Sequence, residues 1–205
     1  MITLHHLRIG RSIFTVWLLE ELNVDYELEI YQRDPTTMKA PPELAKIHPL
    51  GKSPVIDDDG LIISETGAIT AYLLQKFDSQ HRFAPSPDNL SQWATYTQWL
   101  HYPEGSVFVS LLIKMLLMRS GQAHETFEAY CEREIPLQLQ HINNQLGSNK
   151  FIHGEEISGA DFGVTYMVSM AERLGQLENY PNLQDYLNRN RARPAFQRAI
   201  EKAIE

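Results

Sequence analysis

The order of strand-like and helical patterns in residues 1–80 constrains the fold more than any other feature of the sequence. Residues 2–6 are rich in β-forming side chains, and residues 25–31 alternate polar and apolar side chains as a half-exposed strand does. Between them, residues 11–23 are apolar over most of a helical circumference. Because two strands joined through a helix run parallel in one sheet, this stretch predicts a β-α-β unit.

A second strand pair is predicted from the acidic turn that ends in Asp59-Gly60. Apolar residues 55–56 and 61–63 flank this turn, and an Asp-Gly pair between two apolar runs is a strong hairpin signal. A short helical segment in the proline-containing residues 34–49 precedes the hairpin, and a helix is expected to follow from Ser64. The order β-α-β-α-β-β-α predicts a thioredoxin-like α/β domain in residues 1–80.

The rest of the chain carries helical patterns only. Residues 81–89 are polar and contain two prolines, as a linker does, and residues 90–205 are predicted to form an all-helical domain. Its helices are expected at residues 90–119, 124–146, 159–174, 182–190 and 195–204.

Composition excludes several classes of function. The 18 basic and 26 acidic residues give a net charge of −8, which argues against a general nucleic-acid binder. One cysteine excludes an intramolecular disulfide and a multi-thiolate metal site, and the eight histidines lack ligand spacing, so no metal is expected. The sequence has neither a signal-peptide pattern nor an apolar run of membrane-spanning length, so we expect a cytoplasmic protein that does not contact a membrane.

Two loops are candidate binding elements. In the first, His48 to Val55, a Ser53-Pro54 bond at the start of a strand can be cis at modest cost. A cis bond would direct the backbone N–H and C=O of Val55 toward a ligand, whereas an ordinary trans turn is the equally open alternative.

In the second loop, Ser64 is predicted to be the N-cap of a helix whose free N–H groups form an anion site. Glu65 adds a carboxylate that can bind an ammonium group, so the pair suits the zwitterionic head of an α-amino acid. A plain capped helix remains the alternative. Residues 157–162 form a capping-box variant with a hydrophobic staple, to which we assign a folding role only.

Taken in order, HPLGKSPV at 48–55, SET at 64–66 and SGADF at 158–162 resemble the glutathione S-transferase family over nearly the whole chain. WLLEELNVDYEL, the APPELAKIHPLGKSPV stretch and EGS at 104–106 resemble its fungal and bacterial group. The resemblance implies a glutathione-binding thioredoxin-like domain, a helical domain and a homodimer. It also implies detoxification by conjugation of the glutathione thiolate to small hydrophobic electrophiles, with glutathione as co-substrate and no metal.

The resemblance also implies roles for individual residues. Pro54 matches the family's cis-proline, and Val55 would pair its backbone with the cysteinyl part of glutathione. Glu65 and Thr66 would hold the γ-glutamyl end, and Lys52 would reach the glycine carboxylate. We expect the co-substrate pocket near Tyr102 and Ser106, at the end of an aromatic-rich helix.

The loop after the first strand departs from the family pattern. Gly10 stands where a serine is expected in this group, so no side chain there can steady the thiolate. We expect the backbone N–H groups around residues 10–12 to hold the sulfur, aided by Arg11 or by the Ser12 hydroxyl; a helix cap and a surface charge are the alternatives. Glutathione-dependent disulfide or peroxide reduction, and a non-catalytic interaction module, remain open as functions.

Overall fold

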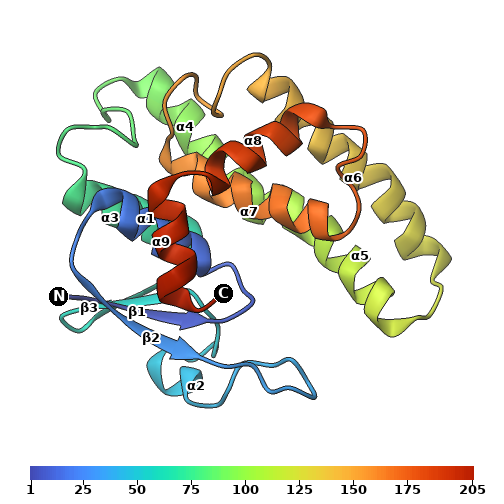
Figure 1. Cartoon of the computed structure of the whole chain (residues 1–205), viewed down its shortest axis with the longest axis horizontal. Helices are drawn as coiled ribbons and strands as arrows, with labels where there is room; N and C mark the ends of the chain where they lie inside the picture. Colours follow the sequence, from blue (N-terminus) through green and yellow to red (C-terminus); the bar gives the residue numbers. More distant parts are fainter. The chain divides into compact units, whose positions relative to one another are not determined.

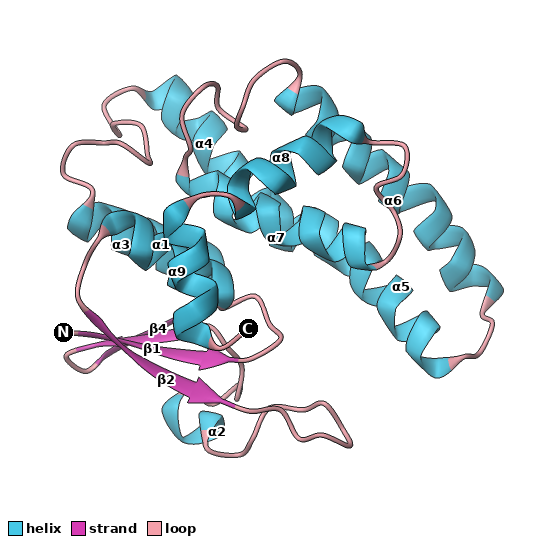
Figure 2. Cartoon of the chain, viewed as in Figure 1, coloured by secondary structure: helices cyan, strands magenta, loops and turns pink.

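A computed structural model describes residues 1–205, and their packing divides them into two units. The first unit contains residues 1–80 and 191–205, and the second contains residues 81–190 (Figure 1). All four strands belong to the first unit, as the colouring in Figure 2 makes clear. The thioredoxin-like layout predicted from the sequence is confirmed.

The first unit is built on one mixed sheet with the strand order β2-β1-β3-β4. β1 (Ile2–Leu7) runs parallel to β2 (Tyr26–Tyr31) and antiparallel to β3 (Val55–Asp58), which forms the predicted hairpin with β4 (Leu61–Ser64). The hairpin turn has positive φ at both Asp59 (52°) and Gly60 (94°), as a two-residue turn between twisted strands requires.

Helices cover both faces of this sheet. In Figure 1, α1 (Ile13–Leu22), α3 (Thr66–Phe77) and α9 (Pro194–Ala203) lie on one face, and the short α2 (Leu44–Ile47) lies on the other. Eight of the ten residues of α1 are buried, as its nearly continuous apolar circumference predicts.

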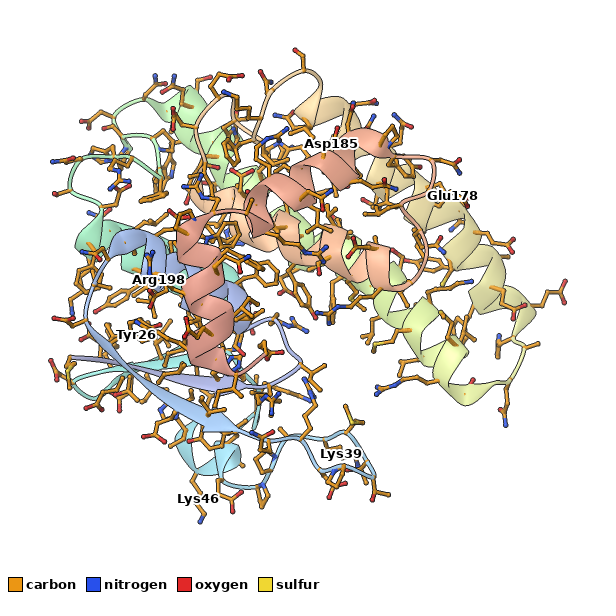
Figure 3. The ribbon with its side chains drawn as sticks, viewed as in Figure 1. Tyr26, Lys39, Lys46, Glu178, Asp185 and Arg198 are labelled. Carbon is orange, nitrogen blue, oxygen red and sulfur yellow. The ribbon has the colours of Figure 1, made fainter.

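The packing of α9 differs from the predicted division of the chain, which placed residues 90–205 together in the helical domain. The buried Glu20 of α1 accepts hydrogen bonds from Arg198 Nε (2.9 Å) and Lys202 Nζ (2.5 Å) of α9, and from the Tyr26 hydroxyl of β2 (2.8 Å). Figure 3 shows Tyr26 and Arg198 on the side of the sheet that carries α9. These contacts attach α9 to the first unit.

The second unit consists of helices. They are α4 (Leu90–Tyr102), α5 (Phe108–Ser120), α6 (Glu125–Leu146), α7 (Gly159–Arg173) and α8 (Pro181–Arg191). The predicted helix at residues 90–119 is three segments, because a π-helical turn, Pro103–Val107, separates α4 from α5. Proline has no N–H to donate to the α-helical hydrogen bonds, so the hydrogen-bonding pattern changes from α-helical to π-helical at Pro103. No helix combines the length and the apolar character needed to cross a bilayer.

The predicted capping box at the start of α7 is present, with Ser158 as N-cap. The Asp161 carboxylate accepts the Ser158 backbone N–H (2.8 Å), the Ile152 backbone N–H (3.0 Å) and the Tyr186 hydroxyl (2.9 Å). Burial raises the pKa of Asp161 despite these bonds. A fully enclosed carboxylate therefore joins α7, α8 and the segment before α7.

Candidate active site

Strand register brings the two candidate binding loops together in the first unit. Val55, the first residue of β3, is paired with Ser64, the last residue of β4, and with His5 near the end of β1. β3 begins where the other two strands end. The 48–55 loop, residues 64–66 and the loop after β1 therefore meet at one end of the sheet.

The 48–55 loop is fixed to β1 through Ser53. The Ser53-Pro54 bond is cis, which decides between the two alternatives left open by the loop pattern and agrees with the family resemblance. Ser53 Oγ donates to the His5 carbonyl (2.8 Å) and accepts the Leu7 N–H (3.0 Å), continuing the strand pairing beyond the end of the β1–β3 ladder. Pro54 and Val55 are buried. The ligand contacts expected of the Val55 backbone stay a prediction.

Lys52 is exposed beside the cis bond. Its neighbour Gly51 has φ +56° and donates its N–H to the His48 carbonyl (2.8 Å), which closes a tight turn just before Lys52. An exposed cation at this end of the sheet fits the predicted contact with a carboxylate.

The predicted capping role of Ser64 is wrong. Ser64 is the last residue of β4, its hydroxyl lies 3.3 Å from His48 Nε2, and α3 begins at Thr66 with Glu65 in the N-cap position. Because pairing with Val55 holds the Ser64 backbone extended, the helix starts later than the sequence pattern predicted. Glu65 is exposed and has φ 72° and ψ 119°, a conformation that side-chain-bearing residues rarely adopt.

Hydrogen bonds from a side chain to backbone carbonyls fix the loop after β1. Arg33 donates from Nε to the Arg8 carbonyl (3.0 Å) and from Nη2 to the Ile9 carbonyl (3.0 Å), and Ile9 has φ 55°. A Cβ on Gly10 would lie 2.8 Å from the Leu7 carbonyl oxygen, closer than real Cβ contacts allow. Arg11, half-buried, follows in the turn before α1.

Ser12 is fully buried and its hydroxyl is engaged inside the unit. Ser12 Oγ lies 2.9 Å from His6 Nδ1, and His6 Nε2 lies 3.2 Å from Glu205 Oε1, which also accepts the Ile9 N–H (2.7 Å). Sequence reasoning missed His6 and Glu205, because nothing in the spacing links β1 to a residue after α9. The expected role of Ser12 at the sulfur stays a prediction, and its position favours a contact inside the protein.

Two histidines of β1 have different surroundings. His5 Nδ1 lies 3.0 Å from the Tyr31 hydroxyl of β2, whereas His6 contacts Ser12, the N-cap of α1, and Glu205 after α9. Adjacent residues of a strand are expected to face opposite sides in this way. Burial lowers the pKa of His5, although Glu29 and Asp57 act in the opposite direction. No group of three histidine, cysteine or carboxylate side chains is arranged to hold a metal ion.

The predicted co-substrate residues lie in the second unit. Tyr102 ends α4, and its hydroxyl donates to the Gln138 side chain of α6. Its ring is in edge contact with Trp99 (5.0 Å between centroids), and burial raises the pKa of Tyr102 to about 12. Ser106 lies exposed in the π-helical turn. Their contact with a co-substrate stays a prediction.

The second unit also contains a cavity of about 380 Å³. Residues 81–85, the first turns of α4, His153 and residues 156–158 line it, and none of the predicted site residues does. The cavity and the predicted glutathione-binding residues are therefore separate features of the chain.

Family models match both parts of the chain. The glutathione S-transferase N-terminal domain matches residues 1–75, and the glutathione S-transferase C-terminal domain matches residues 110–203.

Relatives and solved structures agree with these matches. Glutathione S-transferase 3 of Schizosaccharomyces pombe is 34% identical over 98% of this chain and 88% of its own length. The crystal structure of a glutathione S-transferase from Actinobacillus pleuropneumoniae is similar with a TM-score of 0.90 and 34% identity, over 100% of this chain and 93% of that one. A family member from Pseudomonas fluorescens, solved with two glutathione bound, has a TM-score of 0.81 at 23% identity over 98% and 92%. With both domains matched and the fold shared from end to end, this chain belongs to the glutathione S-transferase family.

Proposed function

We propose that this protein is a glutathione S-transferase that joins the glutathione thiolate to small hydrophobic electrophiles. One observation carries the proposal: strand register gathers cis-Pro54, Val55, Lys52, Glu65 and Thr66 at one end of the sheet. A ligand with two carboxylates and an ammonium group has a charge partner for each end there. Membership of a transferase family supports the same reaction.

Each binding residue has a defined task in this proposal. The Glu65 carboxylate pairs with the ammonium group of the γ-glutamyl end, and Thr66, the first residue of α3, offers the helix terminus to the neighbouring carboxylate. Lys52 pairs with the glycine carboxylate. The backbone of Val55 pairs with the cysteinyl residue, whose sulfur then faces the loop after β1.

The reaction needs an ionised thiol. A free cysteine thiol has a pKa of about 8.5, so only a few per cent is ionised at neutral pH. Backbone N–H groups of the loop, with the Arg11 cation, are the proposed sources of stabilisation. The thiol loses its proton to solvent, the sulfur forms a bond to the electrophilic carbon, and the leaving group departs with its electron pair.

A direct test measures binding and chemistry separately. Titration calorimetry should detect glutathione binding that weakens in Lys52→Ala, and an aryl halide should be consumed faster than a glutathione mixed disulfide. Preference for the disulfide would instead support a reductase, and absence of glutathione binding would contradict both enzymatic functions.

The remaining parts of the proposal concern the co-substrate, the oligomeric state, and the cellular location and role. Tyr102 and Ser106 are proposed to contact the electrophile, so Ser106→Ala should change the KM for the aryl halide and leave that for glutathione unchanged. A cytoplasmic homodimer acting in detoxification is proposed. Sedimentation showing only a 23.6 kDa species at micromolar concentration would contradict the dimer.

A further inference from the structure

Three side chains from distant parts of the first unit form a continuous chain of contacts under the loop after β1. Ser12 Oγ lies 2.9 Å from His6 Nδ1, and His6 Nε2 lies 3.2 Å from Glu205 Oε1. We refer to Ser12, His6 and Glu205 as the buried relay. Ser12 and His6 are fully buried, and only 14% of the Glu205 side chain is exposed.

The two ring nitrogens of His6 face different groups. Nε2 lies at ion-pair distance from Glu205 Oε1, and Nδ1 lies within hydrogen-bond distance of the Ser12 hydroxyl. Burial, the largest single effect, acts to raise the pKa of Glu205, but the neighbouring His6, a hydrogen bond from the Ile9 N–H and the nearby charge of Arg8 hold this pKa below its ordinary value.

These three residue types also occur in hydrolytic triads, but this arrangement cannot act as one. The nucleophilic oxygen of a triad must reach a substrate, whereas Ser12 Oγ has no solvent exposure and is also within 3.3 Å of the Leu7 N–H and carbonyl. The relay is therefore a support for the loop above it.

The relay contacts both ends of that loop. Glu205 Oε1 accepts the N–H of Ile9 at 2.7 Å, and Ser12 is the residue from which α1 starts. Ile9 has the left-handed φ of 55°, which is unfavourable for a β-branched residue and needs a partner to hold it. Arg33 donates hydrogen bonds to the carbonyls of Arg8 and Ile9, and Glu205 accepts the N–H of Ile9. The two side chains together fix both the carbonyl and the amide groups of this segment.

We propose that Glu205 is a positioning residue of the glutathione site: by holding the Ile9 amide, it presents the main chain of residues 9–12 to the sulfur. This inference rests on the proposed function, because it assigns the thiol to this loop. It explains how a chain with glycine at position 10 can supply fixed backbone donors without a side chain at that position.

Two substitutions at one position separate charge from hydrogen bonding. Glu205→Gln and Glu205→Ala both remove the negative charge, but only alanine removes the acceptor of the Ile9 N–H. We expect kcat/KM for glutathione in E205A to be about tenfold below that in E205Q, the usual effect of losing one hydrogen bond in a binding site. The thiol pKa of bound glutathione, followed by ultraviolet absorbance, should be higher in E205A than in E205Q.

A ligand-free measurement tests the relay independently of glutathione. Hydrogen exchange at the Ile9 amide should be about tenfold faster in E205A than in wild type, and close to wild type in E205Q. Glu201→Ala, an exposed glutamate one turn earlier in α9, is the matched control and should change neither exchange nor kinetics.

The outcomes distinguish the relay from the proposed function. If wild type binds glutathione and E205A equals E205Q in kinetics, thiol pKa and exchange, the positioning role is overturned while the transferase function stands. If E205A loses activity only in proportion to its unfolded fraction, Glu205 is merely structural and the proposal is again overturned. If wild type does not bind glutathione, the proposed function fails.

Discussion

The backbone conformation of Glu65 predicts that replacing this residue by glycine raises the stability of the protein and lowers its affinity for glutathione. Glu65 has φ 72° and ψ 119°, is exposed, and directly precedes α3. A residue with a Cβ in such a sparsely populated region costs on the order of 1–3 kcal/mol, and glycine, which has no Cβ, is less restricted at positive φ. Replacing Glu65 by glycine should therefore stabilise the ligand-free protein, and replacing it by alanine should not.

The size of each effect follows from this geometry. Glycine relieves the strain but adds about 0.5–1 kcal/mol of backbone entropy to the unfolded chain, so the net gain should be roughly 0.5–2 kcal/mol. For a chain of this size, that corresponds to a rise in Tm of about 2–6 °C. Both variants lose the carboxylate that is proposed to pair with the ligand ammonium, so glutathione affinity should fall by roughly 10- to 150-fold.

Scanning calorimetry without ligand and titration calorimetry with glutathione measure the two effects. Glu65→Gln is the control for charge, because it keeps the side-chain shape and the Cβ. A Glu65→Gly protein no more stable than Glu65→Ala would refute the strain argument. Unchanged glutathione affinity in both would refute the role of the carboxylate.

Three further predictions concern the loop, α9 and the start of α7. Gly10→Ser should lower stability by about 1–3 kcal/mol without raising kcat/KM, because its Cβ would meet the Leu7 carbonyl at 2.8 Å; a gain in turnover would contradict the description of the loop. Burial, the largest effect at Glu20, acts to raise its pKa, but hydrogen bonds from Lys202, Arg198 and Tyr26 together lower it. The stability that Glu20 adds is therefore complete above the ordinary glutamate pKa of about 4.3 and is lost as the pH falls through the lower folded value, so urea titrations across acidic pH should show a shallower loss in Glu20→Gln. Asp161→Ala should lower the free energy of unfolding by about 2–5 kcal/mol, because it removes the carboxylate of the capping box and leaves the buried Ile152 and Ser158 amides without their acceptor; a thermal melt equal to wild type would contradict this.

Local patterns predicted most elements of the fold. The apolar periodicity of residues 11–23, the alternation of residues 25–31 and the Asp-Gly turn each depend on neighbours in sequence, and all three elements are present. Where the structure differs from these predictions, the cause is a contact between residues far apart in sequence. Ser64 belongs to β4 because its backbone is paired with Val55, and a helix-capping pattern cannot reveal that competition.

Those parts of the candidate site that lie in short sequence motifs could be predicted. The parts that depend on contacts between distant residues could not. The gathering of Lys52 and Glu65 follows from the two loop motifs and the hairpin between them, whereas the cis bond before Pro54 was implied only by the family resemblance. The contact of Glu205 with Ile9 has no local signal, since 196 positions separate the two residues in sequence.

The place of α9 in the first unit has a consequence for biosynthesis. During translation the ribosome releases residues 1–80 well before residues 191–205. The sheet therefore emerges before α9, whose Arg198 and Lys202 donate hydrogen bonds to Glu20. Contacts across such a sequence separation carry a large loop-closure cost and form late. Until residues 191–205 have left the ribosome, the sheet lacks the helix α9 that packs on it, and the Ile9 N–H lacks the Glu205 carboxylate that accepts it.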